Sequence, residues 1–123
     1  MLVREIAGCQ EIVAGDNSLL RELLNPGKDA LELRYSLAVA RIGPGGTTYL
    51  HRLKSSEVYL ILKGSAQMRV GSETEDVGAG QAIYVPPNFI QQISNTGADD
   101  LIFVCIVDPA WREEDEEIVV TGS

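Results

Sequence analysis

From residue 30 onward the sequence is divided into short runs in which apolar and polar residues alternate. The first run spans residues 31–40, where leucine, tyrosine or valine occupies every second position. Glycine, proline and asparagine, which are typical of turns, separate the runs that follow. These strand-like runs lie at about residues 47–52, 57–63, 65–70, 81–86, 89–95 and 100–107. Many short strands with frequent turns predict an antiparallel β-sandwich or barrel.

The segment before these runs differs, because its leucines recur at helical spacing. Two pairs of leucines lie at positions 19–20 and 23–24. Residues 16–18 provide cap residues before them, and Asn25-Pro26-Gly27 provides a stop after them. We therefore predict a short helix at about residues 17–24, which covers one flank or end of the domain.

Charge limits the partners that this chain is expected to have. The 123 residues include 10 basic and 18 acidic side chains, which gives a formal net charge of −8. Such a surface repels phosphate backbones and anionic lipid headgroups. We therefore expect neither nucleic acid nor a membrane surface as a partner. The length suits a single domain, residues 1–123, with a core of its own.

Cysteine content and hydropathy bear on the compartment. Cys9 and Cys105 are too few for a disulfide framework. The chain begins without a basic and apolar signal segment, and no apolar stretch approaches the roughly 20 residues that span a bilayer. The expected setting is soluble, reducing and cytoplasmic.

The strongest chemical feature is the only histidine, His51, which precedes Glu57 by six residues. If the two residues lie on neighbouring strands, an imidazole and a carboxylate meet. Such a pair is able to bind a transition metal or to orient a small substrate. A buried hydrogen bond between the two side chains is the structural alternative, and the residues alone leave both open.

The surrounding pattern resembles the first motif of the cupin family. That motif is glycine, five residues, His-x-His, three or four residues, glutamate, six residues and glycine. In residues 45–64 the matching positions are Gly45, His51, Glu57 and Gly64.

The second cupin motif is glycine, five residues, proline, one residue, glycine, two residues, histidine, three residues and asparagine. Residues 80–95 resemble it, with matches at Gly80, Pro86 and Asn95. The two motifs cover residues 45–95, and the strands around them extend the resemblance over most of the chain. The resemblance implies an all-β cupin jelly-roll barrel, also called a double-stranded β-helix.

Three positions depart from the family pattern. Leu53 replaces the second histidine, Gln91 replaces the third, and Asn88 stands where glycine is usual. In the full family site three imidazoles and one carboxylate hold a divalent metal. The resemblance leaves His51, Glu57 and Gln91 as candidate ligands for one weakly bound ion such as Zn, Mn, Fe or Ni. Asn88 is a mild change, because asparagine tolerates left-handed backbone geometry.

Apolar and aromatic residues near His51 are candidates for the wall of a pocket. If His51 points into the barrel, strand alternation turns Leu53 inward as well. The candidate lining residues are Tyr49, Leu53, Tyr59, Met68, Tyr84 and Phe103. The alternative is that these side chains simply fill a small barrel.

The resulting hypothesis is a small-molecule-binding cupin with an optional metal ion at a degenerate site. The alternatives are a metal-dependent cupin enzyme of the isomerase or oxygenase type and a regulatory or sensory module without chemistry. Whether the protein is an enzyme stays undecided at this point. We also expect the C-terminal tail, residues 108–123, to lie across a flank, with Trp111 anchoring it to the barrel or to a second subunit. Exposed sheet edges favour a homodimer.

Overall fold

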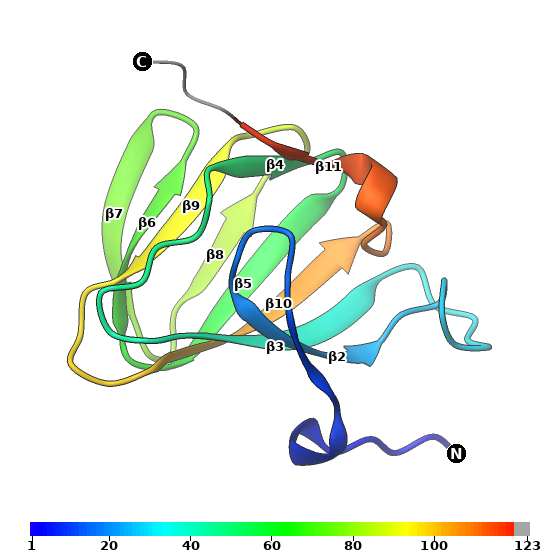
Figure 1. The fold of residues 1–123 in the computed structure, drawn as a ribbon. Helices are drawn as coiled ribbons and strands as arrows, with labels where there is room; N and C mark the ends of the chain where they lie inside the picture. The colour runs from blue at the N-terminus through cyan, green and yellow to red at the C-terminus, as the bar shows by residue number, and fades with distance from the viewer. Residues whose placement is uncertain (120–123) are drawn as a thin grey trace.

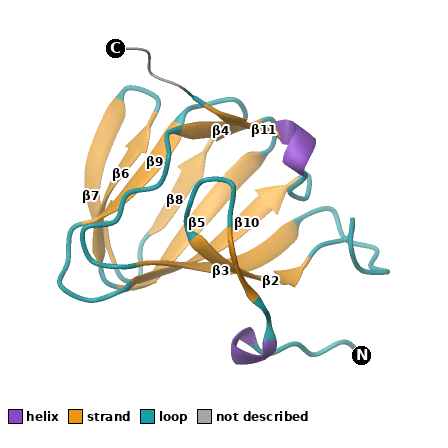
Figure 2. Ribbon diagram, viewed as in Figure 1, coloured by secondary structure: helices purple, strands orange, loops and turns teal. Residues whose placement is uncertain are grey.

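Two antiparallel sheets face each other in the computed structural model, which describes residues 1–119 (Figures 1 and 2). The first sheet has the order β1 (Glu11–Val13), β2 (Leu19–Leu24), β3 (Ser36–Ile42), β10 (Leu101–Asp108), β5 (Ser56–Lys63) and β8 (Ala82–Val85). The second has the order β11 (Glu116–Ile118), β4 (His51–Leu53), β9 (Gln91–Asn95), β6 (Ser65–Val70) and β7 (Glu73–Gly78).

The chain passes back and forth between the sheets from β3 to β11, except at the β6–β7 hairpin. This alternation winds the strands into a jelly-roll barrel and confirms the predicted all-β fold. The two helices of residues 1–119 are single 3-10 turns, η1 (Ile6–Gly8) and η2 (Glu113–Asp115). Neither is long and apolar enough to cross a membrane.

Strand β10 shows how the alternating pattern becomes a barrel wall. Every second residue, from Leu101 to Val107, is buried, and the residues between are half-buried. Strand β10 lies between β3 and β5, so its inner face meets the interior while its backbone is paired on both sides. The two-residue period of the sequence therefore reports the true inner face here.

The predicted helix at residues 17–24 is wrong, because this segment forms strand β2. Strand β2 pairs with β1 on one side and β3 on the other, with Leu20 opposite Ala40. Two adjacent leucine pairs fit a helix face and a strand equally well, and pairing with β3 decides between them. Asp16 and Asn17 belong to the hairpin turn between β1 and β2, where Asn17 has a φ of 75°.

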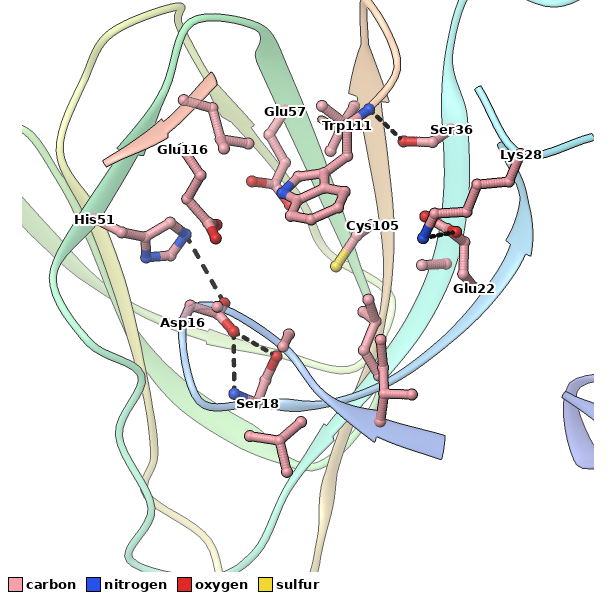
Figure 3. A pocket seen from close by; sticks show the side chains of 18 residues that line it. Asp16, Ser18, Glu22, Lys28, Ser36, His51, Glu57, Cys105, Trp111 and Glu116 are labelled. Atoms are coloured by element: carbon pink, nitrogen blue, oxygen red, sulfur yellow. Dashed lines mark hydrogen bonds and ion pairs between the residues drawn. The ribbon is translucent and has the colours of Figure 1, made fainter. Parts of the chain in front are cut away.

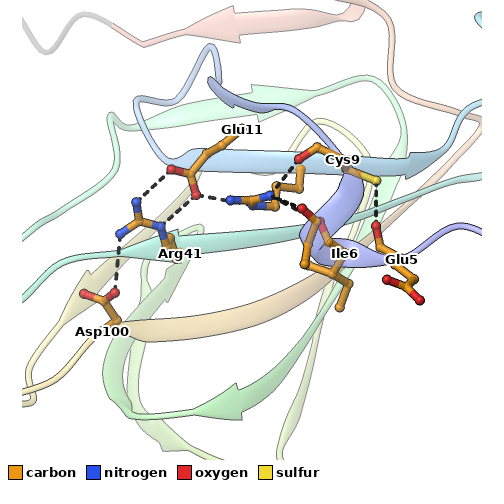
Figure 4. A network of polar contacts seen from close by, with 8 residues as sticks. Glu5, Ile6, Cys9, Glu11, Arg41 and Asp100 are labelled. Carbon is orange, nitrogen blue, oxygen red and sulfur yellow. Dashed lines mark hydrogen bonds and ion pairs between the residues drawn. The ribbon is translucent and has the colours of Figure 1, made fainter.

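A polar network fixes the β1–β2 hairpin to the sheet (Figure 4). Arg41 on β3 donates two hydrogen bonds of 2.7 Å to the Glu11 carboxylate and a longer one to Asp100. Arg21 on β2 donates to the backbone oxygen of Cys9 at 2.7 Å. The Arg41 guanidinium lowers the pKa of Glu11, so Glu11 stays charged. This network fixes the base of the hairpin whose turn carries Asp16.

Two further strands occur where the sequence analysis predicted none. Strand β7 is acidic and mostly exposed, with Val77 as its buried residue, and it forms an edge of the second sheet. Strand β11 lies in the tail and pairs with β4, so the tail extends a sheet rather than crossing a flank. Residues 120–123 of the predicted tail lie outside the described chain.

The packed core occupies the interior between the sheets. Its largest fully buried side chains include Tyr59 and Phe103, whose rings stack with their centroids 5.1 Å apart. The core cluster also contains Ala40, Ile42, Ile61, Ala66, Met68, Val77, Val85, Ile93, Leu101 and Cys105. A cluster of this size accounts for a stable single domain without a disulfide.

Candidate functional site

A cavity of about 130 Å³ adjoins the packed core (Figure 3). Its apolar lining includes Ile12, Val13, Leu20, Ala38, Leu53, Val107 and Trp111. Its polar lining includes Asp16, Ser18, Glu22, Lys28, Ser36, His51, Glu57, Cys105 and Glu116. The volume is close to the roughly 150 Å³ of an engineered protein cavity that binds benzene. The cavity therefore suits a small compact molecule.

His51 presents one ring nitrogen to this cavity. Its Nδ1 lies 2.9 Å from the backbone oxygen of Tyr49, and because a carbonyl only accepts, Nδ1 carries the hydrogen. In the neutral ring this leaves the lone pair on Nε2, which lies 3.8 Å from Oδ2 of Asp16. The side chain is buried, so strand β4 and the Tyr49 carbonyl fix the orientation of the imidazole.

Glu57 enters the cavity from β5 and is 6% exposed. Its Oε1 is buried without a hydrogen-bond partner. Burial raises the pKa of Glu57 from 4.5 to about 8, and the nearby Asp16 carboxylate contributes to the rise. In the free protein at neutral pH, Glu57 therefore holds its proton for most of the time.

Gln91 lies on β9 opposite His51, and it faces the interior, whereas Gln92 donates from Nε2 to the backbone oxygen of Thr48. The amide oxygen of Gln91 accepts a hydrogen bond from the Tyr59 hydroxyl. This oxygen is the atom that a metal ion would need. Because Tyr59 already engages this oxygen, Gln91 belongs to the packed interior and not to a metal site.

The residues present do not fit the metal centre of the family. Leu53 lines the cavity with an alkyl group, and the Gln91 oxygen is engaged by Tyr59. His51 and Glu57 remain from the predicted ligand set. Within residues 1–119, no three His, Cys, Asp or Glu side chains are grouped as a metal ion requires. Two ligands fall short of the three or more protein ligands that such sites use.

Asp16 reaches the cavity from the β1–β2 turn, whereas the sequence analysis predicted only a helix-capping role for it. Its Oδ1 accepts hydrogen bonds from the amide of Ser18 at 3.0 Å and from the Ser18 hydroxyl at 2.7 Å. Its backbone oxygen accepts from the Tyr49 amide at 2.8 Å. The turn is thus fixed directly beside His51. An Asp-Asn-Ser turn was the available sequence signal, but it does not reveal which strand the turn approaches.

Glu116 reaches the same place from the C-terminal strand β11. Burial raises the pKa of Glu116 and Asp16 adds to the rise, whereas His51 acts in the opposite direction. A Cβ at position 15 would overlap the Glu116 carboxylate, so a larger residue there would make the end of the Glu116 side chain shift. The hairpin turn and the tail therefore meet at the cavity.

Trp111 also lines the cavity and anchors the tail to the barrel. Its amide donates to the Ser36 hydroxyl at 2.9 Å, and its backbone oxygen accepts from Asn25 at 3.2 Å. The Lys28 ammonium lies 5.5 Å from the centre of the indole ring and 2.8 Å from a carboxylate oxygen of Glu22. The predicted anchoring role of Trp111 is thus joined by a role in the cavity wall.

The other predicted lining residues have different positions. Tyr59, Met68 and Phe103 lie in the packed core. Tyr49 and Tyr84 point outward, with 51% and 63% of their surfaces exposed. For Tyr49 the physical reason is that regular strand structure begins only at His51, so alternation cannot be extended backward. Asn88 adopts the left-handed conformation expected for it, with a φ of 68°.

Cys105 contributes a thiol to the cavity wall. Burial raises the pKa of Cys105 well above its ordinary value, and the nearby Glu57 carboxyl contributes to the rise. A thiol that does not ionise is a poor nucleophile. Cys105 therefore acts as a small apolar surface.

The jelly-roll topology and the interior cavity define a single-domain barrel protein with a small pocket. The family model for a cupin domain matches residues 38–107, which is more than half of the chain. The chain therefore belongs to the cupin family, as the two motifs implied.

Similar proteins agree on the fold. Over 108 residues the chain is 36% identical to Uncharacterized protein MJ1618 of Methanocaldococcus jannaschii, covering 87% of this chain and 86% of that protein. The polyketide cyclase RemF from Streptomyces resistomycificus has a TM-score of 0.81 at 17% identity, covering 99% of this chain and 87% of that chain. A predicted oxalate decarboxylase from Thermotoga maritima has a TM-score of 0.77 at 21% identity, covering 88% of this chain and 99% of that chain. At these identities the two structures support the fold alone.

Proposed function

We propose that this cupin binds a small molecule in its barrel cavity and that it does so without a metal centre. The observation that supports this most strongly is the Oε1 atom of Glu57. A buried polar atom without a partner costs free energy, and native proteins rarely keep one without a reason. A ligand in the cavity would supply the missing partner.

The chemistry of the cavity favours binding over catalysis. The thiol of Cys105 stays protonated, and the metal ligands of the family are incomplete. A metal-dependent isomerase or oxygenase would need a donor set that Leu53 and Gln91 do not provide. A regulatory module would bind its ligand in the same cavity and would then report the binding to another part of the protein or to a partner. The homodimer stays a prediction, which light scattering after size-exclusion chromatography measures.

A fragment screen tests the proposal. Melting temperature is recorded for the protein with a library of compounds of up to about ten heavy atoms, and with Zn²⁺, Mn²⁺, Fe²⁺ and Ni²⁺ alone. We expect stabilising compounds among the fragments and no specific stabilisation by the metals. Stabilisation grows with ligand concentration when only the folded state binds.

Two matched variants show where the compounds bind. Ala38 lines the cavity, so Ala38→Leu fills part of it, whereas Ala82 is exposed on β8 and Ala82→Leu leaves the cavity unchanged. The stabilisation should disappear in Ala38→Leu and persist in Ala82→Leu. A wild type that responds to no fragment, or responses that survive in Ala38→Leu, would overturn the proposal.

A further inference from the structure

We infer that the ligand is a small organic cation, a protonated amine on a compact apolar body. The inference rests on the proposed small-molecule binding and adds the charge and shape of the ligand. It follows from three features of the cavity: its excess of acidic groups, its unpartnered buried oxygen, and its apolar and aromatic wall.

Three carboxyl groups from separate parts of the chain line the cavity together with one imidazole (Figure 3). Asp16 comes from the β1–β2 turn, Glu57 from β5 and Glu116 from β11. His51 is the basic group among them, and it lies 3.8 Å from Asp16. The remaining charged pair of the wall is already balanced, because Lys28 lies 2.8 Å from Glu22. The wall therefore has an excess of acidic groups.

Several carboxylates elsewhere in the molecule have a different environment. Four of them are each paired with an arginine within about hydrogen-bond distance, as the Arg41–Glu11 pair in Figure 4 illustrates. The pairs are Arg41–Glu11 at 2.7 Å, Arg4–Asp29 at 3.0 Å, Arg52–Glu117 at 3.0 Å and Arg112–Asp115 at 2.9 Å. No arginine is among the residues of the described chain that line the cavity. The carboxyl groups of the cavity therefore have no arginine partner, and a cation that enters from outside would take that role.

An independent observation points to the same site. Glu57 lines the cavity, and its Oε1 atom is buried without a hydrogen-bond partner. An ammonium group carries up to three donors and no acceptor, which complements a set of carboxyl oxygens. A charge-assisted hydrogen bond to such an oxygen is stronger than a neutral one, and a cation beside Glu57 favours release to solvent of the proton that this residue holds in the free protein. An anionic ligand would instead meet three acidic groups.

The apolar lining residues and the cavity volume limit the shape and size of the uncharged part of the ligand. Leu53, Val107 and Trp111 offer apolar surface, and the volume is about 130 Å³. An ammonium already lies beside the indole ring, since Lys28 Nζ is 5.5 Å from its centre. Aromatic faces attract cations in this way. The geometry therefore fits a protonated amine whose body is about the size of a benzene ring.

A charge series on one body tests the inference. Benzylamine, benzyl alcohol and benzoate are titrated into the protein at pH 7 by isothermal calorimetry. We expect benzylamine to bind about tenfold or more tightly than benzyl alcohol, and benzoate to bind most weakly. Equal or tighter binding of benzyl alcohol or benzoate would overturn the inference.

Variants separate charge from shape. Glu116→Gln keeps the size of the side chain and should lower the affinity for benzylamine about tenfold while leaving that for benzyl alcohol unchanged. Glu75→Gln, an exposed change on β7, should leave both affinities unchanged. An equal loss for both probes in Glu116→Gln would mean that Glu116 acts through shape, and the inference would fail. Asp16→Asn repeats the test if Glu116→Gln lowers the melting temperature.

The fragment screen distinguishes this inference from the proposed function. If the stabilising fragments are neutral or anionic, the binding function stands and the cationic ligand is wrong. If no fragment of any charge binds, both fail. If protonated amines dominate the hits and lose their effect in Ala38→Leu, both are supported.

Discussion

Two neighbouring parts of the barrel interior differ sharply, although the same strands build both. Along the inner face of β10, Phe103 lies in the packed core, while Val107 borders the cavity. Along β5, Tyr59 stacks on Phe103, while Glu57 reaches the cavity two residues earlier. The filled part supplies stability through apolar burial, whereas the hollow part buries polar groups at a cost. Proteins accept such a cost chiefly at functional sites.

Truncation in the filled part should produce the largest effect. Phe103→Ala removes a ring that is 1% exposed and stacked on Tyr59. We expect unfolding by urea to show a loss of about 3–5 kcal/mol, because both apolar burial and packing are lost. Tyr84→Ala, at an outward-facing ring, should cost about 0.5 kcal/mol or less. Similar losses in the two variants would contradict the division between core and surface.

A change in the hollow part should act in the opposite direction and depend on pH. The pKa of Glu57 is about 8 in the folded protein and 4.5 in the reference state. Between these values the folded state keeps a proton that the unfolded state releases, so Glu57 lowers stability as pH rises from about 4.5 to 8. Glu57→Gln removes this loss. The variant should match the wild type near pH 4 and exceed it by roughly 3 kcal/mol at pH 7.

Urea unfolding across pH 4–9 measures this difference between Glu57→Gln and the wild type. Glu75→Gln, on the exposed strand β7, serves as the control and should follow the wild type at every pH. A difference for Glu57→Gln that does not grow with pH would show that the carboxyl group is ionised in the folded protein at neutral pH.

The contact between hairpin turn and tail predicts an intermediate effect. In Gly15→Ala the new Cβ overlaps the Glu116 carboxylate and displaces it from the cavity. We expect a loss of about 1 kcal/mol or less in thermal unfolding, because the end of the Glu116 side chain can shift to relieve the overlap. Gly8→Ala is the matched control, because a Cβ there meets no atom within 4 Å. Equal behaviour of the two variants would mean that the turn and the tail do not meet closely in solution.

Metal should have the smallest effect on the wild type. Neither EDTA nor Zn²⁺ or Ni²⁺ should change its melting temperature, because Leu53 and Gln91 do not complete a metal site. The double variant Leu53→His, Gln91→His restores the family donors and should gain stability with Ni²⁺ or Zn²⁺. A wild type that loses stability in EDTA would contradict the metal-free cavity.

Regions where local pattern and tertiary environment agree were predictable. The strands from β3 to β10, apart from β7, overlap runs visible in the sequence, although β3 begins only at Ser36, and β10 keeps its two-residue period throughout. The cupin motifs fixed the inward positions of His51, Glu57 and Gln91, all of which are buried. Strand β2 was not predictable, because its leucine pairs suit either a helix or a strand until β3 is beside it.

The candidate site was predictable only in part. His51, Glu57 and Leu53 line the cavity and were found from the motifs. Asp16 and Glu116 lie 35 residues before and 65 residues after His51, respectively, and neither belongs to a motif. Their convergence depends on the hairpin turn and on the pairing of β11 with β4. Sequence patterns report local periodicity, and they contain little information about which distant segments meet.

The sequence by itself determined the barrel, the cupin family and the inward face that carries His51 and Glu57, because these depend on periodicity and on fixed spacing within short segments. Tertiary structure alone decided the character of the pocket. It engaged the Gln91 oxygen with Tyr59, brought two further carboxyl groups to His51 and left Glu57 Oε1 without a partner. The physical reason is that charge balance and hydrogen-bond satisfaction depend on contacts between residues far apart in the chain.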